Sequence, residues 1–200
     1  MSQLKLTADG GGGTVSLKGP SSTTGNAAIE LTVPGTGSAT VDTLGRAGNI
    51  LQVVQTVKTD TTSYNTIDTW ADISGMSVSI TPSSSSNKIL VTAVLNTGHL
   101  ASSYYILRLE KGGTPIAVGD ASGNRTQGYF GQGPRSNAEL IDNTTINFLD
   151  TAGSTSAITY NIAWYIAYTT GSTLYLNRCN YDANQDYAPR VISTITAMEV

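Results

Sequence analysis

The sequence predicts an all-β protein: an antiparallel, jelly-roll-type sandwich head preceded by an extended, β-rich N-terminal arm. Three observations support this fold class. Only 12% of the residues are charged, and Ser, Thr, Asn and Gly take their place beside ten tyrosines. Short apolar–polar alternations recur between turn residues, as in half-buried strands. The apolar spacing of three and four residues that an amphipathic helix needs is not found in the head.

Residues 1–48 form the predicted arm and residues 49–200 the predicted head. The arm contains short alternating pieces at 4–7, 14–18 and 28–33, and the first aromatic residue of the chain is Tyr64. A segment without large side chains buries little surface by itself. We therefore expect the arm to become ordered by docking on neighbouring chains or a larger assembly; the alternative is a flexible tail. The predicted docking residues keep a period of two: Val15, Leu17, Ile29, Leu31 and Val33.

In the head, alternating or continuous apolar runs predict strands between polar turns. The strongest pattern is I-T-Y-N-I-A-W-Y-I-A-Y at 158–168, where every second residue is large and apolar or aromatic. The nearly continuous run at 88–95 predicts a central strand. Chain ends fray unless they are tied down, so the apolar run at 191–200 also predicts a central position. Further strands are predicted at 50–59, 70–80, 103–110, 114–119 and 173–178.

The strand predicted at 158–168 also carries the predicted subunit interface. Its second face ends in Ala163, Tyr165 and Ala167. Small residues beside one ring would let a neighbouring sheet approach closely, so we expect this face to contact another copy of the chain. The run at 173–178 is expected to pair back onto this strand as a hairpin.

Two polar loops, at 120–137 and 180–190, are the candidate surface- or glycan-binding regions. Tyrosine adds contact area at low entropic cost, and short amides and carboxylates add hydrogen bonds. The alternative is that these rings pack beneath their own loops. The candidate binding residues are Tyr129, Phe130, Tyr181, Asp182, Asn184, Asp186 and Tyr187.

The sequence predicts no catalytic residue and no cofactor. A nucleophilic triad needs a base, and the single histidine, His99, follows a predicted strand without any accompanying motif. The single cysteine, Cys179, cannot form an internal disulfide, and it lies next to Arg178 without a reactive-cysteine motif around it. We interpret His99 as a turn residue and Cys179 as a small residue at the end of a strand.

No metal site is predicted either. Asp182, Asn184 and Asp186 are spaced as at the start of an EF-hand loop. The sixth position is Tyr187 and the twelfth is Ser193, where the motif requires glycine and glutamate. A solvated Asx-rich turn is therefore the expected structure.

Charge and hydropathy exclude several classes of partner. The net charge of −3 argues against nucleic-acid binding, which uses a basic surface. No apolar run approaches the ~18–20 residues of a membrane helix, so no membrane insertion is expected. The N-terminus, M-S-Q-L-K-L-T-A-D-G-G-G-G, lacks the apolar region of a secretion signal. We expect the chain to be made in a cytoplasm and not exported by that route.

The segment Gly11–Gly35, G-G-G-T-V-S-L-K-G-P-S-S-T-T-G-N-A-A-I-E-L-T-V-P-G, resembles the N-terminal segment of fibre-like virion proteins of tailed bacteriophages, especially marine ones. Five runs are similar to the head attached to such segments: 50–55, 73–83, 87–91, 175–178 and 193–200. Heads of this kind often have jelly-roll folds similar to trimeric tumour-necrosis-factor and C1q heads. The resemblance implies a homotrimeric virion protein, made in the host cytoplasm, with an outward-facing head.

The resemblance also implies partners. The arm would dock on other virion proteins of the capsid, neck or tail, and the head would serve host attachment, with a host-surface glycan as a candidate ligand. The chain lacks an extended shaft, which favours a short fibre, spike or capsid-decoration protein over a long tail fibre. A free-standing carbohydrate-binding module is the alternative from another class, and a glycan-degrading enzyme ranks third, because no pair of carboxylates stands out.

Overall fold

The computed structural model describes residues 3–7, 14–18, 49–99, 104–134, 137–167 and 172–200. Its contacts divide the chain into two compact units, Met1–Asp42 and Thr43–Val200. In the first unit β1 (Gln3–Thr7) and β2 (Thr14–Lys18) pair as antiparallel strands. Two of the predicted docking residues, Val15 and Leu17, belong to β2, whereas Ile29, Leu31 and Val33 lie outside the described residues.

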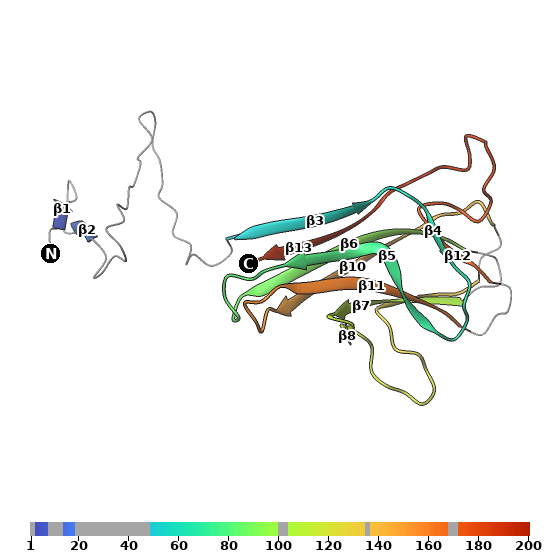
Figure 1. Cartoon of the computed structure of the whole chain (residues 1–200), viewed down its shortest axis with the longest axis horizontal. Helices are drawn as coiled ribbons and strands as arrows, with labels where there is room; N and C mark the ends of the chain where they lie inside the picture. The colour runs from blue at the N-terminus through green and yellow to red at the C-terminus, as the bar shows by residue number, and fades with distance from the viewer. Residues whose placement is uncertain (1–2, 8–13, 19–48, 100–103, 135–136, 168–171) are drawn as a thin grey trace. The chain divides into compact units, whose positions relative to one another are not determined.

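The second unit is a sandwich of two antiparallel sheets, which confirms the predicted all-β fold (Figure 1). In sheet I, β3, β13, β6 and β10 are neighbours in that order, and β12 and β4 continue beside the far end of β6. Its strands are β3 (Gln52–Lys58), β4 (Thr62–Tyr64), β6 (Lys88–His99), β10 (Asp142–Thr151), β12 (Leu174–Leu176) and β13 (Ser193–Glu199).

In sheet II, β5, β11 and β7 are neighbours, and β8 and β9 both pair with the outer edge of β7. Its strands are β5 (Trp70–Ile80), β7 (Tyr104–Lys111), β8 (Thr114–Ile116), β9 (Phe130–Gln132) and β11 (Ile158–Ala167). The long strands β3, β5, β6, β7, β10, β11 and β13 alternate between the two sheets along the chain. The chain therefore crosses between the two sheets at each step from one long strand to the next.

The core lies between the sheets and follows the alternation that the sequence predicted. From β11, Tyr160, Ile162, Trp164 and Ile166 point inward and are buried. The facing strand β6 contributes Ile89, Val91, Ala93 and Leu95 to this core. The strand β7, which lies beside β11 in sheet II, contributes Tyr105, Leu107 and Leu109. In β5 the alternation is broken between Ile73 and Met76, where the register with β11 shifts at a bulge. Gly75 takes a φ of 80° there, so both flanking apolar residues can face the core.

The structure confirms both predicted central strands. β6 pairs with β10 on one side and with β13 and β12 on the other. β13 lies between β3 and β6, and its end is held by reciprocal backbone hydrogen bonds between Val200 and Lys88 at 2.9 and 3.1 Å.

Two sequence predictions are corrected. The run at 173–178 is not the hairpin partner of β11; β12 pairs with β4 and β6 in the opposite sheet. The chain passes from sheet II to sheet I between β11 and β12. The residue types of a turn do not indicate whether the next strand pairs in the same sheet or in the opposite one. The sequence also missed β10, because Asn143, Thr145 and Asn147 make most of its outer face polar and Ile146 is its only fully buried large apolar residue.

Candidate functional site

The two ends of the sandwich differ. β3 begins and β13 ends at one end, which we call the entry pole (Figure 1). At the opposite end, which we call the distal pole, β7 and β10 begin, β11 ends, and the loop 177–192 extends from β12 to β13 (Figure 1). The candidate binding residues of the 180–190 loop therefore lie at the distal pole.

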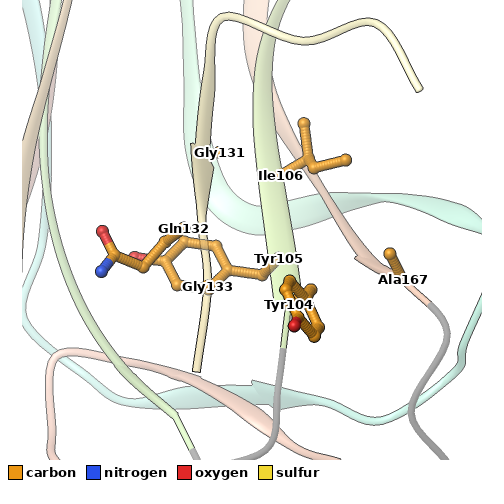
Figure 2. Close-up of a pocket in the computed structure, with 7 residues that line it drawn as sticks. All are labelled: Tyr104, Tyr105, Ile106, Gly131, Gln132, Gly133 and Ala167. Carbon is orange, nitrogen blue, oxygen red and sulfur yellow. The ribbon is translucent and has the colours of Figure 1, made fainter. Parts of the chain in front are cut away.

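A hollow of about 560 Å³ lies at the distal pole on the outer face of sheet II. Figure 2 shows its lining: Ile106 and Ala167 point to one side of the strands, whereas the Gln132 side chain points to the other. The ring of Tyr104 is 48% exposed. Gly131 and Gly133 leave the β9 side of the hollow without side chains, so its surface is mainly apolar. Tyr104 was not recognised from the sequence, because its alternation marked it only as part of a strand.

The rings of Tyr129 and Phe130 are less exposed than their glycine-rich surroundings predicted. The Tyr129 hydroxyl donates to the Asn147 carbonyl and accepts from the Asn147 amide, both at 3.0 Å. Phe130 packs 6.1 Å from the buried Tyr105 ring, centroid to centroid. Both rings are half-buried against the core, as in the alternative in which they pack beneath their own loop.

The 180–190 loop, in contrast, presents its candidate residues to solvent. Tyr181 and Tyr187 stack with their centroids 6.0 Å apart and their planes at 11°. Their exposed fractions are 44% and 51%. The hydrogen bond with Tyr181 raises the pKa of Tyr187. The negative charge of the ionised Tyr181 side chain raises it further, by a smaller amount.

Asp182 is fixed at the base of the same loop by two arginines. Its Oδ1 lies 2.5 Å from Nη2 of Arg190, and its Oδ2 lies 3.4 Å from Nη1 of Arg178. Arg178 itself is held 3.8 Å above the centroid of the Tyr175 ring. No group of three or more His, Cys, Asp or Glu side chains suited to a metal ion occurs within the described ranges.

The predicted interface residues lie on the outer face of sheet II. Ala163 is only 1% exposed, so other residues of its own chain already cover it. Tyr165 packs 5.2 Å from Trp70, and the Trp70 ring also contacts the Arg108 guanidinium at 3.9 Å. Burial, and then a hydrogen bond to Asp68 at 3.0 Å, raise the pKa of Tyr165. Ala167 lines the hollow of Figure 2.

A buried polar network lies beside this aromatic cluster. The Arg108 Nε donates to Glu110 at 2.7 Å, and the Asn161 amide donates to both Glu110 and Asp72. The three side chains Arg108, Glu110 and Asn161 satisfy one another, which explains how a carboxylate that is 4% exposed is tolerated in a β-sheet.

The single histidine and the single cysteine are both buried. His99 Nδ1 lies 3.6 Å from Asp142 Oδ2, and its ring meets Tyr105 edge-on at 5.0 Å. The Cys179 thiol donates to the Tyr181 carbonyl at 2.8 Å. Both residues thus pack inside the distal pole.

The outer face of sheet I is a surface that the sequence did not identify. Register places Leu149, Leu90, Met198 and Val53 in one apolar row across β10, β6, β13 and β3. Val53 and Leu149, at the two ends of this row, are 55% and 54% exposed. The next row is uncharged: Asn147, Thr92, Thr196 and Gln55, with Gln55 donating to Thr196 at 2.8 Å. We call these two rows the apolar sheet face.

No helix of the described residues is long and apolar enough to cross a membrane. No protein-family model matches the sequence, and no curated protein matches it.

Proposed function

We propose that this chain is a structural protein of a tailed-bacteriophage virion: a short trimeric fibre, spike or capsid-decoration protein. In this proposal the arm docks on the particle, and the head faces outward and contacts the host surface. The polarity of the head supports it, since the chain enters at the entry pole and the exposed tyrosines are at the distal pole.

The observation that carries the proposal is the apolar sheet face. Monomeric proteins rarely leave contiguous apolar surface exposed, and larger patches mark interfaces. Here an apolar row spans four strands, and the neighbouring row adds only uncharged side chains. An uncharged sheet face can be buried against further copies of the chain without burying unpaired charge. We therefore assign the trimer contact to this face, with the Tyr165 face of β11 as the competing location.

Light scattering on the full chain tests the assembly. We expect a trimer at micromolar concentration, and we expect the double variant Val53→Asp, Leu149→Asp to be monomeric, because two carboxylates would be buried in the contact. Both positions are about half exposed in the single chain, so the fold should persist. Ser74→Asp, exposed on β5, is the control.

Three results would change the assignment. A monomeric wild-type protein would overturn the trimer. Dissociation by Tyr165→Asp but not by the double variant would place the contact on β11. Absence of the protein from purified phage particles, measured by mass spectrometry, would overturn the virion role even for a trimer.

The second candidate function, a free-standing carbohydrate-binding module, is favoured by the exposed Tyr181–Tyr187 pair alone. It predicts a monomer that binds glycan equally well after deletion of residues 1–48. The virion protein instead needs those residues to enter the particle.

A further inference from the structure

A second, open hollow lies in the loop 177–192 and differs in chemistry from the one in Figure 2. Its volume is about 330 Å³, at the lower end of the range for small-ligand sites. Polar side chains dominate its lining, which comprises Asp182, Ala183, Asn184, Gln185, Ala188 and Arg190.

The carboxylate of this hollow is held in place before any ligand arrives. Arg190 and Arg178 each form an ion pair with one oxygen of Asp182, and Arg178 makes a cation–π contact with the Tyr175 ring. A carboxylate has about four lone-pair sites. Two ion pairs leave acceptor capacity, so Asp182 can receive a hydroxyl hydrogen without first reorienting.

Two amides complete the polar lining. The side chains of Asn184 and Gln185 are exposed, and neither has a hydrogen-bond partner within the described part of the chain. Each amide offers a donor and an acceptor side by side. This pairing suits hydroxyl groups, which donate and accept at once.

The stacked tyrosines flank the lining in sequence, with Tyr181 directly before Asp182 and Tyr187 directly before Ala188. Their nearly parallel rings are 44% and 51% exposed and offer flat apolar surface. A ligand that fits both must carry hydroxyls at its rim and a C–H face that packs on an aromatic ring.

We propose that this hollow binds one neutral hexopyranose unit of a surface glycan. This deepens the proposed function, on which it rests for the outward direction of the distal pole. A neutral sugar is chosen over an acidic one because the loop's charges balance: Arg178 and Arg190 are matched by Asp182 and Asp186, and both arginines are already paired with Asp182. An anion would bring a second negative charge beside that carboxylate.

Saturation-transfer NMR with the full chain tests the site. The probes are the methyl pyranosides of glucose, galactose and mannose at about 10 mM, since a single shallow sugar site has an affinity near the millimolar range. N-acetylneuraminic acid is the charged comparison. We expect transfer to at least one neutral probe, and Asn184→Ala and Tyr187→Ala each to weaken it about fivefold, the loss of roughly one neutral hydrogen bond or ring contact.

Two matched controls locate the site. Asn124→Ala removes an exposed amide from another loop, and Tyr104→Ala removes the exposed ring of the hollow in Figure 2; both should leave binding unchanged.

No transfer to any neutral probe, transfer to N-acetylneuraminic acid alone, or loss of binding only in Tyr104→Ala would each overturn the proposal. Light scattering and particle composition are measured separately, so failure of sugar binding is distinguishable from failure of the virion role.

Discussion

Glu199, one residue before the end of the chain, is a buried carboxylate that ties the entry pole together. It accepts hydrogen bonds from Gln52 Nε2 at 2.5 Å, Asn87 Nδ2 at 2.6 Å, and the Ser83 amide and hydroxyl, both at 2.7 Å. Burial alone would raise its pKa. These hydrogen bonds outweigh burial and lower the pKa from 4.5 to about 2.

This shift predicts a pH-dependent stability. The pKa is lower in the folded chain than in the unfolded one, so the stabilisation is complete above pH 4.5 and is lost as pH falls toward about 2. At ~1.36 kcal/mol per pKa unit, a shift from 4.5 to about 2 corresponds to a loss of about 3 kcal/mol. Urea unfolding of wild type and Glu199→Gln across this range measures it. The Gln variant should be less stable at neutral pH, and the difference should shrink in acid; a constant difference would contradict this prediction.

Asn177 illustrates a residue whose role only the structure reveals. It is fully buried with a φ of 64°, in the left-handed region that asparagine tolerates better than most residues. Its amide donates to the carbonyls of Lys58 and Asp60, both at 2.8 Å, and its oxygen accepts from Ser193 at 2.6 Å. One side chain thus joins the end of β3 to the start of β13. In the sequence it is merely one polar residue in Y-L-N-R.

Among the elements, the far end of β6 lies very close to the segment that follows β12. A Cβ added at Gly98 would lie 2.4 Å from the Arg178 carbonyl oxygen and 2.7 Å from the Cys179 Cα. Both are backbone atoms, which cannot turn away as a flexible side chain could. Gly98 therefore allows β12 and the loop 177–192 to lie against β6.

We expect Gly98→Ala to destabilise the head by about 3 kcal/mol, because the overpacking must move backbone. The urea midpoint should fall, with an unchanged slope. Gly119→Ala is the matched control: its nearest neighbour is 4.0 Å away, so its effect should stay within about 0.5 kcal/mol. If the two variants had equal urea midpoints, the backbone beside Gly98 would be able to move aside for the added methyl group, which would contradict this prediction.

Strand prediction succeeded where one face is apolar and failed where both are polar. β11 was predicted with its inward residues, because large side chains recur at every second position. β13 was predicted as a central strand from its apolar run, without a choice of its inward face. β9, only three residues long, was hidden within a glycine-rich loop. The Thr- and Asn-rich β10 carries too little apolar signal, although it pairs with β6 over its whole length. β10 is stabilised by its backbone pairing with β6 and by the burial of Ile146, not by an apolar pattern in its own sequence.

At the scale of the whole molecule, contacts group residues Thr43–Val200 as one compact unit. Its core and the hydrogen bonds of Glu199 and Asn177 all lie within residues 49–200. A fragment of residues 49–200 should therefore show a cooperative thermal transition and the near-ultraviolet circular dichroism of the full chain. In the virion proposal, the same fragment should be absent from particles. Non-cooperative melting would show that the arm completes the head's core.

The candidate sites were predictable only in part. The exposed Tyr181–Tyr187 pair and Asp182 were named from composition, since tyrosines and short polar residues in one loop favour a binding surface. The sequence could not distinguish that exposed pair from the half-buried Tyr129 and Phe130, because both sets sit in polar loops. Burial depends on what lies beneath a loop, here Asn147 and Tyr105, more than 15 residues away in the chain.

The sequence by itself determined the fold class, the place of the strongest strands and the contrast between arm and head, because alternation and composition are local properties. The tertiary structure decided which strands are neighbours, which rings are exposed, and that Leu149, Leu90, Met198 and Val53 form one row. Those outcomes depend on register between segments distant in the chain. A period of two defines the two faces of a strand without saying which of them will be covered.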